Sequence, residues 1–234
     1  MRGEALGGLT CAACAWMAYA VRGRSSTFLA PSVYRGSRRR RSIALTFDDG
    51  PSEGTNQLLQ ILNRYQAPAT FFVCGMNVKR LPAVARAVAA FGHEIGNHSY
   101  SHPALYLRSR RFIKDELLSA QSIIADTTGT APTLFRAPYG ARWFGLRQAQ
   151  RELNLLGVMW TVLGLDWKLP ADRIARRILS GADNGAILCL HDGRGTRSNP
   201  DIHETLEAVE RILPVLQSRG FTFQTVSQLL CPNN

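Results

Sequence analysis

The order of the apolar segments constrains the fold of this chain more than any other feature. From residue 43 onward, short apolar runs alternate with longer amphipathic stretches, and such runs are typical of buried strands when turn residues bound them. Strands that alternate with helices predict a parallel sheet, and the chain fits an α/β fold with an incomplete (β/α) barrel better than an open sheet. We expect seven strands, at residues 43–47, 69–73, 93–96, 133–136, 155–162, 186–190 and 221–223.

The stretches between these runs have the periodicity of helices that bury one face. Leucine and isoleucine recur at helical spacing in residues 57–65, and a proline stands in the first turn of residues 81–91. The length of the chain suits one large domain or two small ones, with a large hydrophobic core. We expect helices at residues 57–65, 81–91, 109–127, 144–153, 171–179, 202–218 and 226–230.

The first 21 residues differ from the rest of the chain. Met1-Arg2-Gly3-Glu4 precedes an uncharged apolar stretch that runs to Val21, as in signal peptides, with Ala18-Tyr19-Ala20 as a possible cleavage motif of small residues. The stretch is also about as long as a short membrane-spanning helix. We therefore expect a signal peptide or a membrane anchor, and a protein that is exported or anchored facing the cell wall. The basic residues that follow argue against simple export, because positive charge tends to stay in the cytoplasm.

Residues 22–42 are expected to form a basic linker. Residues 1–42 contain eight arginines and one glutamate, a net charge of +7 out of +11 for the whole chain, so residues 43–234 carry only +4. An arginine cluster beside an apolar segment favours contact with a membrane or an anionic polymer, although a solvated linker has the same composition. We expect no nucleic-acid partner, because the body has no nucleic-acid-binding motif and no strongly basic balance.

Two adjacent carboxylates follow the first expected strand. Residues 43–47 lead directly into Asp48 and Asp49, and such close carboxylates need a cation or a shared proton. His98 and His102 follow the third strand at positions i and i+4, which lie on one face if the segment is helical. Two histidines and one carboxylate are the usual ligands of a catalytic zinc. Taken singly, the aspartates are also typical of a turn, and such a histidine pair also occurs on surfaces by chance.

Polar residues follow most of the expected strands. In a (β/α) barrel the C-terminal ends of all strands face one mouth, so side chains at these positions are expected to converge even when they are far apart in the sequence. The residues concerned are Asp48, Asp49, His98, His102, Arg136, Asp166 and His191.

These residues resemble the ordered motifs of a known family. The segments are Thr46-Phe47-Asp48-Asp49, His98-Ser99-x-x-His102, Arg136-x-Pro138-Tyr139, Asp166-Trp167 and Leu188-x-Leu190-His191. They are similar, in order and spacing, to the five motifs of the polysaccharide deacetylases (carbohydrate esterase family 4, the NodB homology domain) over residues 43–230. The resemblance implies a distorted barrel of about seven strands and a divalent metal, commonly zinc. It also implies removal of acetyl groups from N-acetylated sugars of a polysaccharide, such as peptidoglycan or a chitin-like oligosaccharide.

The resemblance further implies roles for individual residues. The metal ligands would be Asp49, His98 and His102. Asp48 would be the general base, with Arg136 as the natural partner that keeps it ionised.

The remaining implied roles concern the acid and the substrate. His191 would be the general acid, oriented by Asp166. Substrate contacts would come from the Tyr139 backbone N–H, as an oxyanion donor, and from Trp167 and Leu190, as walls of a slot for the acetyl methyl group.

Two positions depart from the family pattern, and three other functions stay open. Leu163 replaces an aspartate that many relatives carry, and Cys189 lies two residues before His191, where a bulky aliphatic residue often lines the acetate slot. The alternatives are an O-acetyl xylan esterase, a hydrolase of small non-sugar amides, and a non-catalytic carbohydrate-binding relative. A binding module would be expected to lose Asp48, Asp49 or His191, and all three are present.

Overall fold

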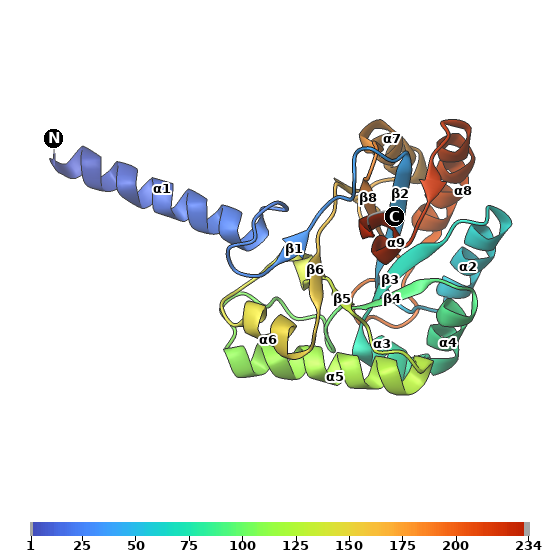
Figure 1. Ribbon diagram of the computed structural model, residues 1–234, viewed down its shortest axis with the longest axis horizontal. Coiled ribbons are helices and arrows are strands. Elements are labelled where there is room, and N and C mark those ends of the chain that lie inside the picture. The colour runs from blue at the N-terminus through green and yellow to red at the C-terminus, as the bar shows by residue number, and fades with distance from the viewer. Residues whose placement is uncertain (1, 232–234) are drawn as a thin grey trace.

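The computed structural model describes residues 2–231, with side chains from residue 12 onward. At its centre lies a curled sheet in the order β1-β6-β5-β4-β3-β2-β8-β7, and β9 pairs with β2 outside this path (Figure 1). All pairings between these strands are parallel. The strands are β1 (Ser32–Val33), β2 (Ser42–Gly50), β3 (Ala69–Val73), β4 (Glu94–Asn97), β5 (Leu134–Phe135), β6 (Leu156–Val158), β7 (Val162–Leu163), β8 (Ile187–His191) and β9 (Thr222–Phe223).

Helices connect and cover these strands. The long helix α5 begins at a serine cap, where Ser109 Oγ accepts from the Phe112 N–H, and ends at Gly129 in the left-handed conformation. The helices are α1 (Arg2–Arg22), α2 (Thr55–Arg64), α3 (Gly75–Arg80), α4 (Pro82–Ala90), α5 (Arg110–Thr128), α6 (Leu146–Glu152), α7 (Ala171–Gly181), α8 (His203–Ser218) and α9 (Val226–Leu230), with a short 3-10 turn η1 (Pro138–Gly140). The expected α/β fold with an incomplete barrel is therefore confirmed.

One expected strand is wrong: residues 155–162 form two strands at different places in the sheet. β6 pairs with β5 and β1, whereas β7 pairs with β8 at the opposite edge. Residues 159–161 join them across the open side of the barrel. Thr161 anchors this crossing, because its N–H donates to Ile187 O and its hydroxyl donates to Tyr34 O. A continuous apolar run in the sequence does not show where one strand ends and the chain crosses to another part of the sheet.

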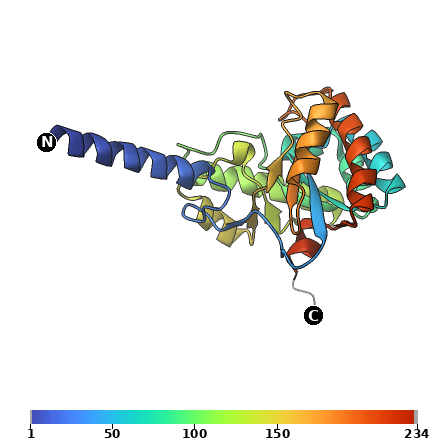
Figure 2. The ribbon, with the colours of Figure 1, turned by 90° about the horizontal axis from the view of Figure 1, so that it is seen from above.

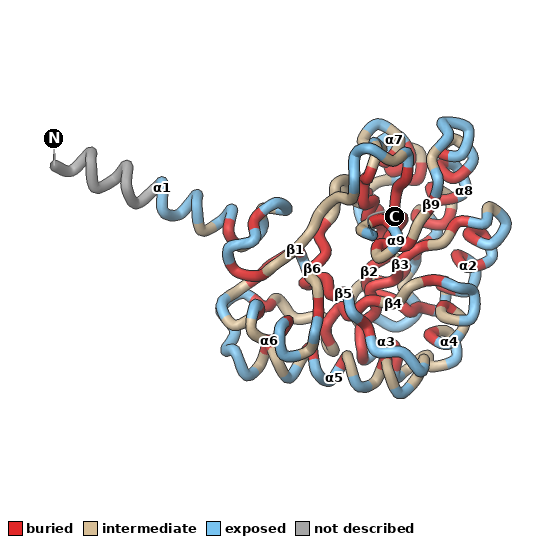
Figure 3. The backbone as a smooth tube through the Cα atoms, viewed as in Figure 1, coloured by how far each residue is buried: buried red, intermediate tan, exposed pale blue. Residues whose placement is uncertain are grey.

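Alternation along β2 separates the core from the barrel interior. Ile43, Leu45 and Phe47 belong to the main hydrophobic core with residues of α2, α4, α7 and α8, and Figure 3 shows this buried centre. Their neighbours Ala44, Thr46 and Asp48 point to the other face, because successive side chains of a strand alternate. The interior of the barrel therefore becomes polar toward the C-terminal end of β2.

The N-terminal helix α1 projects away from the barrel, and only its C-terminal end approaches the rest of the chain (Figures 1 and 2). Among the described residues, no helix is long and apolar enough to cross a bilayer. The segment expected as a linker, residues 22–42, contributes β1 and buries Leu29 and Ala30. Arg142, which is 2% exposed, holds this segment by donating to the carbonyls of Val21, Gly23 and Ser26.

Candidate active site

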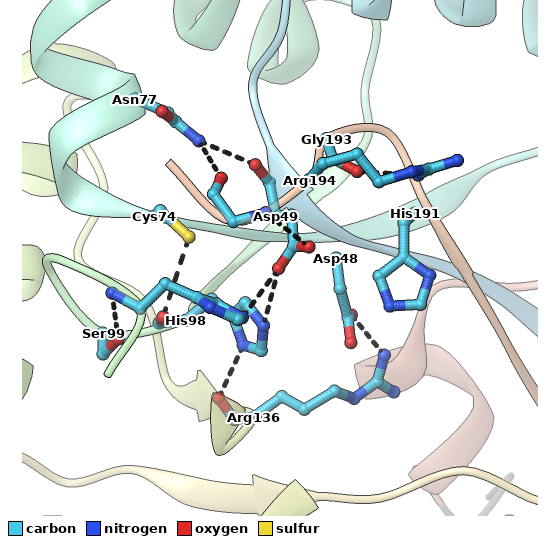
Figure 4. A network of polar contacts seen from close by, with 12 residues as sticks. Asp48, Asp49, Cys74, Asn77, His98, Ser99, Arg136, His191, Gly193 and Arg194 are labelled. Carbon is cyan, nitrogen blue, oxygen red and sulfur yellow. Dashed lines mark hydrogen bonds and ion pairs between the residues drawn. The ribbon is translucent and has the colours of Figure 1, made fainter. Parts of the chain in front are cut away.

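Asp49, His98 and His102 converge at the C-terminal ends of β2 and β4. Asp49 Oδ1 lies 3.3 Å from His98 Nε2 and 2.9 Å from His102 Nε2, and one ligand atom from each residue lies within 4.8 Å of the other two. Ligands of a tetrahedral zinc would be about 3.4 Å apart at ordinary Zn–N and Zn–O lengths. The three side chains therefore have the spacing of a metal site, and Figure 4 shows the Asp49 carboxylate pointing toward His98.

The hydrogen bond of the His98 ring to the backbone also favours a metal. Its Nδ1 lies 2.7 Å from the backbone carbonyl of Arg136 and donates to it, so that Nε2 of the neutral ring carries a lone pair. Asp49 Oδ1 is buried and has no hydrogen-bond partner among the described residues. A cation or a proton between Asp49 Oδ1 and the imidazole nitrogen would satisfy both buried atoms. Burial raises the pKa of Asp49, but the contacts with His102 and His98 outweigh it and hold the pKa well below its usual range.

The turn that brings the two histidines together is not helical. Ser99 and His102 both have a positive φ, 64° and 58°, and residues 98–102 contain no helix. Ser99 Oγ accepts from the His102 N–H, and Asn97 Oδ1 accepts from the Ser99 N–H. The spacing predicted the pair, but an irregular turn held by these two side chains brings its members together.

A network of backbone contacts fixes the Asp49 carboxylate. Asp49 has a φ of 70°, its Oδ2 accepts from the Gly195 N–H at 2.8 Å, and its carbonyl accepts from Asn77 Nδ2 at 2.8 Å. A Cβ atom on Gly193 would lie 2.1 Å from the Asp49 carbonyl oxygen, so only glycine fits at this close approach. The loop after β8 and the start of α3 thus hold Asp49 toward the histidines.

Asp48 is paired with a buried arginine. Arg136, which is fully buried, donates from Nη1 to Asp48 Oδ1 at 2.6 Å and to Thr46 Oγ1 at 2.7 Å. The rest of the guanidinium donates to the carbonyls of Val158 and Met159. The charge is therefore balanced by one carboxylate, and its N–H groups have partners, as a buried ion pair requires.

His191 and Asp166 form the second charged pair of the site. His191 Nδ1 lies 2.8 Å from Asp166 Oδ1, and the His191 N–H donates to Asp166 Oδ2 at 2.8 Å. Thr205 also donates to Oδ2, at 2.7 Å, and Arg194 Nη2 donates to the Asp166 carbonyl. Burial lowers the pKa of His191, but Asp166 outweighs this effect and the pKa is raised to about 9. The imidazole is therefore protonated at neutral pH.

Two aromatic residues lie exposed beside these groups. The ring of Tyr139 packs edge-on against His102 with the centroids 4.8 Å apart, and Trp167 packs edge-on against His191 at 5.0 Å. They are 60% and 49% exposed, respectively, which is unusual for large aromatic residues that serve only the core. Tyr139 has a φ of 58°, a conformation rare for a residue with a side chain.

Leu190 does not lie with these residues. It is fully buried and belongs to the main core with Phe47. Because side chains alternate along β8, it points away from the face that carries His191. Cys189 occupies the inner face instead, with Sγ 3.5 Å from Asp48 Oδ2. The structure thus assembles every sequence-predicted site residue except Leu190.

Sequence reasoning missed several residues that support the site. Asn77 lies on α3, a helix that the sequence analysis did not expect, and Thr205 and Arg194 bind Asp166 from loops and helices beyond the motifs. Asp192 is buried behind the site, where burial raises its pKa to about 7 despite a hydrogen bond from Thr55. Asp192 adjoins His191 in the sequence, but nothing in the sequence distinguishes it from a turn residue.

The arrangement contains the components for the hydrolysis of an amide or ester. It combines three residues that could hold a metal, a carboxylate held by an arginine, and an imidazole held by a carboxylate. A base, an acid and a site that polarises the carbonyl are the requirements of such hydrolysis.

Sequence relatives agree with this geometry. A family model described as polysaccharide deacetylase matches residues 35–158. The peptidoglycan-N-acetylglucosamine deacetylase PgdA of Listeria monocytogenes is 36% identical over 207 residues, which are 87% of this chain and 42% of that protein. The chain thus spans less than half of that relative. A chitooligosaccharide deacetylase of a Bradyrhizobium species is 36% identical over 198 residues, which are 81% of this chain and 90% of that protein.

Solved structures share the fold but differ in activity. The Bc1960 peptidoglycan N-acetylglucosamine deacetylase matches with a TM-score of 0.79 and 30% identity, over 84% of this chain and 91% of that one. BA3943 of Bacillus anthracis, described as a CE4 family pseudoenzyme, matches with a TM-score of 0.78 and 27% identity, over 87% and 69%. Because an enzyme and a pseudoenzyme share this fold, the residues at the strand ends decide whether a chain is catalytic.

Proposed function

This chain belongs to the polysaccharide deacetylase family, and on that premise we propose that it removes acetyl groups from the N-acetylated sugars of a polysaccharide. The observation that carries the proposal is the convergence of the Asp49, His98 and His102 cluster with the Asp48–Arg136 and His191–Asp166 pairs at one end of the barrel. Peptidoglycan and chitin-like oligosaccharides are the two substrate classes to test, because relatives are named for peptidoglycan and for chitooligosaccharide. The reaction breaks the amide C–N bond with water and gives acetate and a free amine.

Asp49, His98 and His102 would hold a divalent metal. One carboxylate and two imidazoles suit zinc, with further positions left for water and substrate. When bound, the metal would supply a Lewis acid for the acetyl carbonyl and lower the pKa of water. The backbone contacts of Asp49 and the Arg136 carbonyl behind His98 keep these ligands in place, as outer partners of metal ligands commonly do.

Asp48 would act as the general base. Its Oδ1 is taken by Arg136, which fixes the carboxylate and leaves Oδ2 to accept a proton from the attacking water. The pairing also balances the charge of the two buried side chains. Arg136 is thus a positioning residue that acts through Asp48.

His191 would act as the general acid. Because its pKa is about 9, the imidazole carries a proton at neutral pH that it can give to the departing amine. Asp166 holds Nδ1, so Nε2 is the nitrogen that donates. The backbone N–H of Tyr139 would stabilise the oxyanion, and the exposed Trp167 ring would contact the substrate.

The direct test is acetate release by the full-length protein from N-acetylglucosamine oligomers and from peptidoglycan. We expect equal amounts of acetate and free amine, and loss of release when a chelator removes the metal. Asp48→Asn should reduce the rate by about 100-fold or more, because a positioned base contributes roughly that factor. The matched control is Asp172→Asn, which removes an exposed carboxylate on α7 and should leave the rate unchanged.

Other results would change the proposal. Release that persists after Asp48→Asn would remove Asp48 from the role of base. No release from either polymer, with the metal bound and the protein folded, would contradict the proposal and direct attention to O-acetyl esters, small amides or carbohydrate binding without catalysis.

We also propose that residues 1–21 take the protein to the cell surface, where a wall polymer would be available. The arginines of residues 22–42 would contact an anionic lipid or polymer there. Cleavage after Ala20 would leave Val21, Gly23 and Ser26 bound to Arg142. These hydrogen bonds therefore do not require the apolar helix. Cell fractionation with mass measurement of the N-terminus tests this, and a cytoplasmic protein with an intact N-terminus would contradict it.

A further inference from the structure

A second set of possible metal ligands lies on the inner face of β2 and β8. The parallel register pairs Thr46 with Cys189 and Asp48 with His191, so alternate side chains of the two strands meet inside the barrel. One ligand atom from each of Asp48, Cys189 and His191 lies within 4.8 Å of the other two. None of the three belongs to the Asp49, His98 and His102 site.

We propose that Asp48, Cys189 and His191 form a second, inhibitory site for a thiophilic divalent cation such as Zn²⁺ or Cd²⁺. Occupation of this site would take the base and the acid out of the reaction together. The inhibition rests on the proposed function, because it presumes that Asp48 and His191 are the base and the acid. Binding of the cation does not depend on that function.

The distance between the sulfur and the carboxylate oxygen matches a tetrahedral ion. Cys189 Sγ lies 3.5 Å from Asp48 Oδ2, and a Zn–S bond of about 2.3 Å with a Zn–O bond of about 2.0 Å also places sulfur and oxygen about 3.5 Å apart. Asp48 Oδ1 and His191 Nδ1 are occupied by Arg136 and Asp166. The outer atoms of the ligands are therefore already held, and Oδ2, Sγ and Nε2 are the atoms left to bind.

The charge of the pocket also permits the ion. Arg136 Nη1 lies 3.6 Å from Sγ, and its positive charge opposes any added cation. Binding, however, requires the Cys189 thiolate, so the thiol proton leaves as the cation enters and the negative charges of Cys189 and Asp48 offset the charge of the ion. Ligand deprotonation of this kind commonly accompanies metal binding.

Thiolate should make the site selective. Sulfur prefers Zn²⁺ and Cd²⁺ over Mg²⁺ and Mn²⁺, which prefer oxygen ligands. The catalytic candidates Asp49, His98 and His102 offer no sulfur, so a metal–thiolate signal distinguishes the two sites. Cys74 is the other buried cysteine among the described residues. It is absent from both ligand sets and serves as the matched control.

The experiment titrates Cd²⁺ into the full-length protein in which Cys11, Cys14 and Cys231 are serine, so that only Cys74 and Cys189 keep thiols. Bound Cd²⁺ is measured by equilibrium dialysis, and the cadmium–thiolate charge-transfer absorption is followed in the ultraviolet. We expect two equivalents to bind and the absorption to appear with one of them. Cys189→Ser should bind one equivalent without the absorption, whereas Cys74→Ser should behave like the parent.

A second readout is acetate release with added Zn²⁺. Once a first equivalent is present, a second should reduce the rate by about 100-fold, the contribution expected of a base or an acid alone, and Mg²⁺ should not. Cys189→Ala, made in case the serine variant is unstable, should remove this inhibition. A single bound equivalent, or an absorption that persists without Cys189, would overturn the second site. Binding with no acetate release in any condition would contradict the proposed function instead.

Discussion

Arg136 and Arg142 are six residues apart and both are almost completely buried, yet their surroundings differ. Arg136 has a carboxylate at 2.6 Å and lies in the candidate active site. Arg142 contacts the carbonyls of Val21, Gly23 and Ser26 and the hydroxyl of Ser32. Burial lowers the pKa of Arg142.

The difference shows how to separate a catalytic charge from a structural one. A buried charge paired with an opposite charge at a strand end serves chemistry, because the pair places and balances a reacting group. A buried charge bound by carbonyls holds a chain segment, because one guanidinium joins several carbonyls of that segment. Burial alone does not distinguish the two arginines.

Loss of Arg136 should have the largest effect. Arg136→Gln leaves the Asp48 carboxylate buried without its partner, which we expect to cost about 3–5 kcal/mol in the free energy of unfolding. The variant should also lose acetate release by about 100-fold or more, because the base is no longer placed. Denaturant unfolding and acetate release measure the two effects. A variant that is less stable but keeps the full rate per folded molecule would make Arg136 a structural residue like Arg142.

Loss of Arg142 should reduce stability without changing the chemistry. Arg142→Ala removes the guanidinium hydrogen bonds to three carbonyls, each of which keeps one other donor. We therefore expect a loss of roughly 0.5–1.5 kcal/mol for each hydrogen bond removed. We expect a lower free energy of unfolding and proteolytic cleavage within residues 20–36, with the rate per folded molecule retained. The control is Arg147→Ala, since Arg147 donates to the Thr27 and Phe28 carbonyls from an exposed position. A large loss of rate in folded Arg142→Ala would erase the distinction between the two arginines.

The His191–Asp166 pair should set the alkaline limit of activity. An acid must be protonated to act, so the rate should persist below a pH of about 9 and fall as the pH rises through the pKa of His191. Asp166→Asn removes the carboxylate that raises this pKa, so the alkaline limit should move down by more than about one pH unit. A pH–rate profile with an unchanged alkaline limb would show that another group sets it.

An exposed arginine should matter least. Arg176 pairs with Asp172 at 2.6 Å on the surface of α7, and exposed pairs contribute about 0.2–1 kcal/mol at most. Arg176→Ala should therefore change neither the rate nor, beyond this range, the free energy of unfolding. A loss as large as that of Arg142→Ala would mean that burial is not what separates these arginines.

Much of the fold could be predicted from the sequence because the strands are short apolar runs with clear ends. Ile43–Phe47 and Ala186–Leu190 correspond to β2 and β8, whose register brings Asp48 beside His191. The division of residues 155–162 into two strands could not be predicted, because both strands are apolar. They differ in the neighbours with which they pair, since β6 pairs with β5 and β7 pairs with β8.

The site was predictable where residue type carries the chemistry. Aspartate and histidine at strand ends indicated Asp49, His98 and His102, although the turn between the histidines depends on Asn97 and Ser99. Arg142 looked like any other arginine in a basic chain, because its role depends on which carbonyls surround it. Leu190 was predicted to line the slot for the acetyl methyl group, but it lies in the main core. Because side chains alternate along β8, Cys189 faces the site instead.

The central claim is that Asp48 and His191 divide the work of base and acid. The most direct measurement compares His191→Ala with the wild type on an N-acetylated sugar oligomer and on an aryl acetate, whose leaving group needs no proton. We predict that the rate falls by about 100-fold or more on the amide and by less than about tenfold on the ester. Equal losses on both substrates would contradict the assignment of His191 as the acid.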